Sequence, residues 1–334
     1  MARSGVLWLG VGVSVVFAWL AVRGAKPGEV RDALTAMEPL WLLPAGLLLV
    51  AAFALRAVRW RSLFTPDSRP PLGDVVRALY VGYLFNAVLP LRAGEVARVV
   101  ALRRRGRASL AETTATIVVE RLFDVLSLLL LLFVMLPWLP SLGFEAAATA
   151  LAATLVGVLA VSIAAVVLYG ERLAAAAIRL FARLPRLSEE RLSGPAEHML
   201  RGLAGLRTAR MGLVAFGWTT LSWLVVGLGF WLLQLAFGIE LSPLAGLLVV
   251  IAIGLAMILP NTPGAVGVFE GAAVLALAAY GVDESAALSY ALVLHALSIV
   301  PFLLLAPFVL PAYRRAAETT QPERAVDAIR PVRT

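Results

Sequence analysis

The sequence predicts an all-α, polytopic membrane protein with about six full spans and two re-entrant helical hairpins in an inverted-topology repeat. Of its 334 residues, 61% are hydrophobic and 15% are charged, whereas soluble domains are about 45–50% apolar and about 25% charged. Several uncharged runs reach the roughly 20 residues that a helix needs to cross a bilayer. Two segments, 85–95 and 258–270, interrupt the apolar sequence in the same way, each with a Leu-Pro pair, a nearby Asn and a Gly followed by a Glu.

The apolar runs predict the spans in chain order. They lie at residues 6–22, 40–58, 113–136, 147–169, 212–237 and 286–310. We expect the first run to be a retained span and not a cleaved signal, because no small-x-small cleavage site follows it. Arg56 and its neighbours lie at the end of the second run, where a long basic side chain can extend to the interface.

Arginine placement predicts the orientation. The segments 56–61, 103–107 and 171–210 are rich in Arg, whereas 137–146, 238–242 and 281–285 contain none. The Arg-rich segments should lie on the cytoplasmic side, which places both termini in the cytoplasm.

The two interrupted segments fit as hairpins that enter the membrane from opposite faces. Residues 75–104 are flanked by Arg on both sides and consist of short apolar pieces, so we expect them to enter and leave on the cytoplasmic side. Residues 244–281 have Arg-free flanks and should enter from outside. Irregular backbone at the hairpin tips requires a protein or water environment.

This arrangement predicts one transmembrane domain, 1–313, followed by a cytoplasmic tail, 314–334. Its pseudo-repeat halves are 1–136 and 147–310. The connecting segment 171–210 has stripes of Arg and Leu at helical spacing, which is typical of an amphipathic helix at the membrane surface. A plain connector remains an equal alternative for that segment.

Composition excludes several classes of function. The chain has no cysteine and two histidines, which excludes disulfides, thiol catalysis and a Cys- or His-rich metal site. We predict no cofactor. The net charge of +8 suits an anionic membrane surface and follows from basic residues that flank apolar spans, so nucleic acid is not predicted as a partner.

Six ionisable residues lie at membrane depth in the first half. They are Arg92, Glu95, Arg98, Glu120, Arg121 and Asp124. A charge there costs several kcal/mol unless it is paired or hydrated. Since the formal charges sum to zero, one hypothesis is a salt-bridge network that joins the hairpin to span 113–136. The other is that Arg92 or Arg98 exchanges a carboxylate for an anionic lipid head group, and both can hold together.

The second hairpin offers backbone groups. Thr262 is a good N-cap and Pro263 a good first helical residue, so a helix that starts there would direct free N–H groups to mid-membrane, where they bind anions. Gly264 and Gly267 carry no side chain, so another helix or a head group can approach this helix start closely. The alternative is that these glycines serve only close helix packing. Glu270 binds a cation or proton, or caps a network. We expect His295 to be hydrogen-bonded structure, and Trp residues near span ends, such as Trp60, to be interface anchors.

These motifs together resemble the transmembrane region of lysylphosphatidylglycerol synthases, a family that includes stand-alone flippase-like proteins of bacteria and archaea. The resemblance rests on three ordered motifs: Asn86-x-x-x-Pro90-x-Arg92-x-Gly94-Glu95-x-x-Arg98, then Glu120-Arg121-x-x-Asp124, then Leu259-Pro260-x-x-Pro263-Gly264-x-x-Gly267-x-x-Glu270. In complete synthases this region is held to move aminoacylated phosphatidylglycerol between leaflets, while a soluble domain synthesises it. The resemblance does not carry the synthase activity to this sequence.

We therefore expect translocation of an anionic phospholipid or polyprenyl-phosphate-linked lipid across the bacterial or archaeal cytoplasmic membrane, and we favour a transporter over an enzyme. The alternatives are a membrane-embedded transferase acting on polyprenyl-linked sugars and an accessory subunit that anchors another enzyme. Partners are the lipid head group and membrane lipids; a homo-oligomer or a lipid-modifying enzyme stays open. The candidate substrate-binding residues are Asn86, Pro90, Arg92, Glu95, Arg98, Glu120, Arg121, Asp124, Asn261, Thr262, Pro263, Gly264, Gly267 and Glu270.

Overall fold

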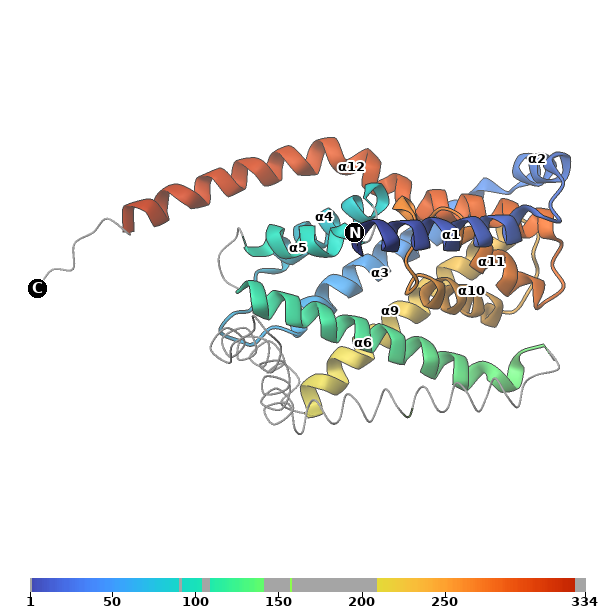
Figure 1. Cartoon of the computed structure of the whole chain (residues 1–334). Coiled ribbons are helices and arrows are strands. Elements are labelled where there is room, and N and C mark those ends of the chain that lie inside the picture. Colours follow the sequence, from blue (N-terminus) through green and yellow to red (C-terminus); the bar gives the residue numbers. More distant parts are fainter. Residues whose placement is uncertain (1, 90–91, 104–108, 141–156, 158–208, 328–334) are drawn as a thin grey trace, which may run out of the picture.

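The computed structural model describes residues 2–89, 92–103, 109–140, 157 and 209–327. Regular structure in this part of the chain is helical throughout, as predicted (Figure 1). In order, the elements are α1 (Ala2–Val22), α2 (Pro27–Ala36), η1 (Pro39–Trp41), α3 (Leu42–Ser62), α4 (Leu72–Val88), α5 (Ala93–Arg103), α6 (Leu110–Met135), η2 (Leu136–Trp138), α9 (Ala209–Ala236), α10 (Pro243–Ala256), η4 (Pro263–Ala265), α11 (Val268–Ala278) and α12 (Glu284–Asp327).

Three stretches of the described chain are long and apolar enough to cross a membrane by length and composition. They are Pro39–Ser62, Arg210–Ala236 and Glu284–Leu310, and they contain or closely match the predicted spans 40–58, 212–237 and 286–310. Helices α1 and α6 cover the predicted spans 6–22 and 113–136. The predicted span 147–169 and the amphipathic segment 171–210 lie outside the described residues. Helix α12 continues past residue 313, and the division into domain and tail there stays a prediction.

The first interruption separates α4 from α5. Leu89 takes an extended conformation, with φ −105° and ψ 146°, as expected for a residue that precedes proline. Arg92, just before α5, has a left-handed φ of 53°. Pro90 lies outside the described residues. The two helices pack closely, since a Cβ added to Gly94 would lie 1.9 Å from the carbonyl oxygen of Gly82.

The second interruption separates α10 from α11. Helix α10 ends at Ala256, and the three-residue 3-10 turn η4 intervenes before α11 begins at Val268. Left-handed backbone at Gly264 (φ 66°) and Gly267 (φ 87°) makes this turn, a conformation that glycine adopts without steric cost. A Cβ on Gly267 would also lie 2.4 Å from the Ser14 carbonyl oxygen of α1.

The two hairpins open at opposite ends of the helical bundle. At one end, Arg61 of α3 donates to the Pro70 carbonyl just before α4, at 3.1 Å. At the other end, the Glu38 N–H donates to the Ala236 carbonyl at the end of α9, at 2.9 Å, and α10 starts a few residues later. Figure 1 shows α4 and α5 toward one end of the molecule and α10 and α11 toward the other.

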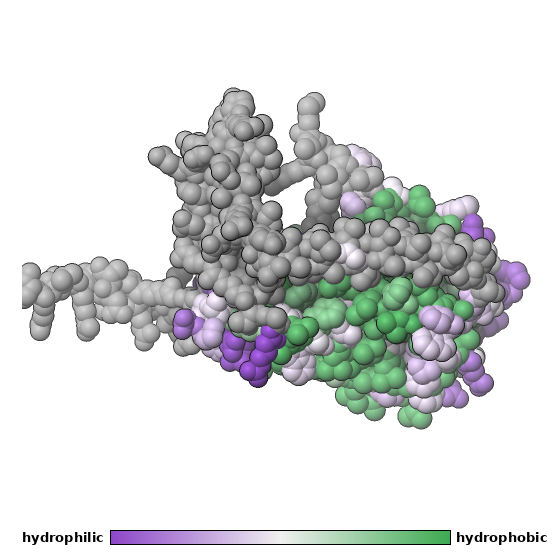
Figure 2. All heavy atoms as spheres, turned by 90° about the horizontal axis from the view of Figure 1, so that it is seen from below, coloured by the Kyte–Doolittle hydropathy of each residue, from purple (hydrophilic) through white to green (hydrophobic). Residues whose placement is uncertain are grey.

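The packing repeats in the two halves in the way an inverted repeat requires. Helix α3 packs on α9, α4 packs on α12, and α6 packs on α10. Each pair joins one element of the first half to one of the second half. Two apolar cores result, one around α9, α10, α11 and α12 and the other around α3, α4, α5 and α6. On the face shown in Figure 2, hydrophobic residues cover the middle and hydrophilic residues gather toward the two ends.

Candidate functional site

Six buried or partly buried charged side chains meet where α3, α5 and α6 pack together. This charge cluster contains three arginines and three carboxylates: Arg59, Arg98, Arg121, Glu95, Glu120 and Asp124. Glu120 lies at its centre and receives Arg59 at 2.9 Å, Arg98 at 3.1 Å and Arg121 at 2.9 Å. The formal charges cancel, which is how a protein keeps such groups away from water.

The cluster joins the first hairpin to α6. Arg98 of α5 bridges Glu95 at 2.7 Å, three residues earlier on the same helix, and Glu120 of α6. Arg121 of α6 reaches back to Glu95 at 3.2 Å and to Asp124 at 3.3 Å. The predicted network between hairpin and span 113–136 is therefore present.

Sequence reasoning missed Arg59, which completes the cluster from α3. Its guanidinium contacts Asp124 at 2.5 Å and Glu120 at 2.9 Å, and its side chain is buried. The sequence predicts that residues 56–61 lie at the cytoplasmic interface and that Arg92 is the third cation of the network. The available signal was that Arg59 lies one helical turn beyond Arg56 and beside Trp60, at the end of an apolar run.

Aromatic side chains enclose the cluster. The Asp124 carboxylate also accepts from the Trp223 indole at 3.2 Å, and the Arg98 guanidinium lies over the Trp60 ring at 4.8 Å. The prediction that Trp60 is an interface anchor is wrong, because its ring is fully buried and its N–H donates to Thr116 at 3.1 Å. Arg56, from the same turn of α3, donates to the Tyr83 hydroxyl at 2.8 Å.

Access to the cluster is unequal. The Arg121 side chain is 42% exposed, whereas those of Arg98 and Glu120 are 3% and 2% exposed. The Nε atoms of all three arginines, Arg59, Arg98 and Arg121, are buried without a hydrogen-bond partner. Of the three cations, Arg121 is therefore the one that an anion from outside could reach while its carboxylate partners remain in place.

Arg92 makes none of the ion pairs of the charge cluster and instead links the two interruptions. Its guanidinium donates to the main-chain carbonyl of Met257, at the end of α10. Nearby, a Cβ added to Gly264 of η4 would lie 3.2 Å from the Ala87 carbonyl oxygen at the end of α4. The tips of the two hairpins therefore meet, although they come from opposite ends of the bundle.

The two asparagines stabilise their own turns. Asn86 Oδ1 accepts from the Gly94 N–H at 2.8 Å and so ties α4 to α5. Asn261 donates to the Leu259 carbonyl at 3.1 Å. Thr262 is held from α1, since its N–H donates to the Ser14 hydroxyl at 3.1 Å.

The start of α11 differs from the prediction of an open helix end at Pro263. Thr262 and Pro263 begin only the short turn η4, and the Thr262 side chain caps no N–H there. The α-helix begins at Val268, where the Glu270 carboxylate accepts from the Gly267 N–H at 2.8 Å. The Glu270 carboxylate therefore already occupies the start of α11, and this helix end is not open to an external anion.

The other oxygen of Glu270 contacts His295 Nδ1 of α12 at 2.5 Å, and His295 Nε2 lies 2.8 Å from the Gly264 carbonyl oxygen. His295 is thus hydrogen-bonded, as expected. Among the described residues, no group of three or more His, Cys, Asp and Glu side chains could hold a metal ion.

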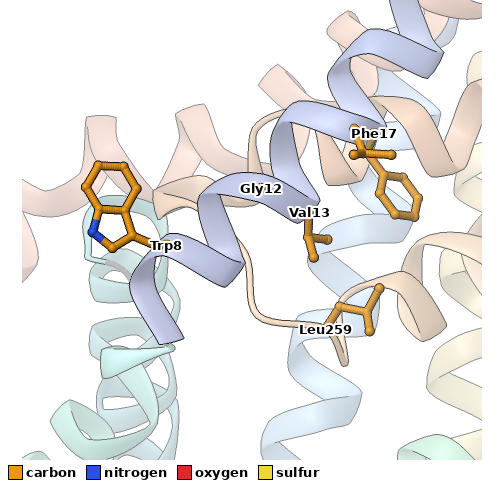
Figure 3. A pocket seen from close by; sticks show the side chains of 6 residues that line it. Trp8, Gly12, Val13, Phe17 and Leu259 are labelled. Carbon is orange, nitrogen blue, oxygen red and sulfur yellow. The ribbon is translucent and has the colours of Figure 1, made fainter. Parts of the chain in front are cut away.

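An apolar pocket of 440 Å³ opens beside the second interruption. It is lined by Trp8, Gly12, Val13, Val16 and Phe17 of α1 together with Leu259. Figure 3 shows Val13, Phe17 and Leu259 side by side between the helix and the loop. Its lining carries little polar surface, so it suits hydrocarbon and not a head group.

Apolar helices, paired interruptions and a buried neutral charge cluster define an integral, polytopic helical membrane protein. Residues 7–306 match the family of the lysylphosphatidylglycerol synthase TM region. The chain belongs to this family, and its membership confirms the resemblance seen in the sequence motifs.

The chain is similar to three named proteins of archaea. It is 28% identical over 329 residues to the glycosyltransferase AglD of Haloferax volcanii, covering 89% of this chain but only 52% of that protein. It is 26% identical over 306 residues to a UPF0104 membrane protein of Methanothermobacter thermautotrophicus, covering 85% of this chain and 88% of the relative. A second UPF0104 membrane protein of that organism is 28% identical over 271 residues. The chain thus spans about half the length of the glycosyltransferase that it matches.

Proposed function

We propose that this protein moves an anionic lipid, a phospholipid or a polyprenyl-phosphate-linked lipid, between the leaflets of the cytoplasmic membrane, with both of its termini in the cytoplasm. One observation carries the proposal: Arg92 of the first hairpin reaches Met257 of the second, where tips from opposite ends of the bundle meet. Irregular backbone and an arginine at such a place form a polar site in an apolar surrounding. A head group in transit needs a site of this kind.

Phosphate recognition falls to Arg92 and Arg121. Arg121 is 42% exposed, so a phosphate can approach its guanidinium while Glu95 and Asp124 stay in contact with it, and the planar guanidinium suits phosphate oxygens. Arg98, the other arginine that the sequence predicts for this role, is buried and bridges Glu95 and Glu120. We assign Arg98 and Arg59 to keeping the carboxylates in place.

The lipid tail has its own path in this proposal. The pocket beside α1 is apolar and ends at Leu259, within the second interruption. A head group at the hairpin tips would leave its acyl or prenyl chain next to this pocket and the surrounding bilayer. Rocking of the two halves about the meeting point of the tips would then expose the head group to either side.

Purified protein in liposomes tests the proposal by measuring the movement of fluorescent lipids between leaflets. We expect anionic lipids to move and zwitterionic ones to move more slowly. Arg92→Ala should slow movement at least tenfold, a loss of about 1.4 kcal/mol or more, while the protein still extracts as a folded species. Arg103→Ala, an exposed residue at the end of α5, is the control. Wild-type rates in Arg92→Ala would remove Arg92 from the mechanism.

The name of one relative, a glycosyltransferase, favours a second candidate, a transferase acting on a lipid-linked sugar. Glu120 and Asp124 would have to act as acid and base, yet both are bound by arginines. Incubation of the protein with a labelled sugar donor and a polyprenyl phosphate separates the two candidates, since product formation would favour the transferase. A third candidate, an anchor for another enzyme through 171–210, predicts stoichiometric capture of that enzyme without lipid movement.

A further inference from the structure

The Glu270–His295 pair presents two hydrogen-bond acceptors to one imidazole ring. Nε2 lies 2.8 Å from the Gly264 main-chain oxygen, and a carbonyl can only accept. Nδ1 lies 2.5 Å from a Glu270 oxygen. The other Glu270 oxygen accepts from the Gly267 N–H, so the carboxyl group is fixed from both sides.

These contacts determine how many protons the Glu270–His295 pair holds. The contact with Gly264 requires a hydrogen on Nε2. The contact with Glu270 requires a second hydrogen, either on Nδ1 of an imidazolium or on the carboxyl oxygen. In both forms the pair is neutral overall and carries one proton more than a carboxylate beside a neutral imidazole. The Phe269 ring stacks on the imidazole with centroids 4.3 Å apart, which favours the cationic form of the ring.

Other ionisable groups around the pair are few in the described part of the chain. Helix α10 has none, and α1 has none from Trp8 to Val22. On α12, the Tyr290 hydroxyl donates to the Phe230 carbonyl, and Glu284 lies at the start of the helix.

The facing hairpin contributes three nearby ionisable groups. From α4, Tyr80 donates to the Phe302 carbonyl and Tyr83 accepts from Arg56. Arg92 donates to Met257. The side chains of Glu270 and His295 are each 10% exposed, which lets a proton exchange with the outside.

We propose that Glu270 and His295 together bind one transferable proton, and that this proton latches the tip of the second hairpin, so that lipid movement is coupled to proton binding. The proposal rests on the proposed function for its last clause. The latch itself, proton binding that holds η4 against α12, stands on the contacts alone.

Loss of the proton to water changes the pair from neutral to a net charge of −1. The remaining ring hydrogen then moves to Nδ1, because a hydrogen bond to a carboxylate is stronger than one to a neutral carbonyl. Nε2 would face the Gly264 carbonyl with a lone pair, and the two acceptors repel each other. The tip is released, and its left-handed Ala265, with φ 58°, can relax from a conformation that costs a non-glycine residue energy.

The direction in pH follows. At low pH the proton is bound and η4 is held; as the pH rises the latch opens. Because Gly264 also contacts the end of α4 at Ala87, an opened latch frees the place where the two hairpins meet.

Histidine NMR tests proton binding directly. The chain has two histidines, so His198→Gln labelled with ¹⁵N-histidine reports His295 alone. We expect the ring signals to change as the pH is raised, and this change to vanish or shift in Glu270→Gln, whose amide can donate to Nδ1 without titrating. His295 ring signals that do not change with pH, or that change identically in Glu270→Gln, would overturn the proposal.

A cysteine label tests the latch. The natural chain has no cysteine, so Val266→Cys, at an exposed position next to η4, is a single reporter. Its modification by a small maleimide should speed up as the pH rises. It should be fast at every pH in His295→Gln and slow at every pH in Glu270→Gln. A rate that follows only the reagent's own pH dependence, measured on the exposed control Val96→Cys, contradicts a latch.

Lipid movement tests the coupling. In liposomes, the wild type and His198→Gln should show a pH-dependent rate of lipid movement, and Glu270→Gln a flat and slow one. If the protein moves no lipid at any pH, the proposed function fails, while the NMR and labelling results still decide the latch. If lipid moves at the same pH-dependent rate in Glu270→Gln, proton coupling at this pair is excluded.

Discussion

At the scale of single residues, the site depends on charges whose partners lie far away in the sequence. Arg59 and Glu120 lie on different helices, α3 and α6, yet they lie 2.9 Å apart in a buried place. Each ion there has lost its water and relies on its partner. The free energy of the folded state should therefore be sensitive to the loss of one partner and much less sensitive to arginines at the rim.

Arg59→Met should lower the free energy of unfolding by about 3–5 kcal/mol, because it leaves Glu120 and Asp124 with one cation fewer in a buried site. Arg61→Ala is the control, since this neighbouring arginine is partly exposed and its side chain donates to a main-chain carbonyl, that of Pro70, and not to the charge cluster. Thermal unfolding in detergent measures both. Equal stability of the two variants would contradict the prediction that Glu120 and Asp124 depend on Arg59 in a desolvated site.

At the scale of elements, each hairpin depends on glycines that let two backbones approach. In the first hairpin, the Gly94 N–H donates to Asn86 and its Cα faces the Gly82 carbonyl. In the second, Gly267 and Gly271 face the carbonyls of Ser14 and Phe17 on α1. Helices in a bilayer associate through close contacts of this kind, because lipid tails are as apolar as the side chains and the hydrophobic effect does not drive helices together there.

Gly94→Ala should destabilise the first hairpin, because its methyl group would lie 1.9 Å from the Gly82 oxygen and overpacking costs about 1–3 kcal/mol or more. Gly73→Ala in the same hairpin has no atom within 4 Å of the added carbon and should be neutral or slightly stabilising. Proteolysis or thermal unfolding in detergent compares the two. If both variants behave alike, α4 and α5 do not pack as described.

At the scale of the whole molecule, the two hairpins open at opposite ends of the bundle, as an inverted repeat would require. Helix α3 runs from the end where the second hairpin opens to the end where the first one opens. The tips then meet at Arg92 and Met257. Under the proposed function, a head group at this meeting point would be reached in turn from each side of the membrane.

Single cysteines in this cysteine-free chain test the inversion. Arg77→Cys near the opening of the first hairpin and Glu240→Cys just before α10 both lie at exposed positions. In sealed vesicles, a membrane-impermeant maleimide should reach them from opposite sides, with Arg77→Cys on the cytoplasmic side. Labelling of both from one side would contradict the inverted arrangement.

Much of the fold could be predicted because its signals are local. The ends of α4 and α10 follow from Pro90 and Pro260, and spans such as 40–58 follow from hydropathy summed over about 20 residues. The Glu95–Arg98 contact follows from helical spacing alone. Trp60 was misplaced because an aromatic residue at the end of an apolar run looks the same whether it meets the interface or a neighbouring helix.

By itself, the sequence determined that the chain is a helical membrane protein, where its helices break, and which half carries the charges, because hydropathy, proline and charge act within a few turns of the chain. Only the tertiary structure decided that Arg59 completes the charge cluster, that Glu270 pairs with His295, and that Arg92 links the two hairpin tips. Those contacts depend on which faces of distant helices turn toward each other, and close packing between helices sets that rotation.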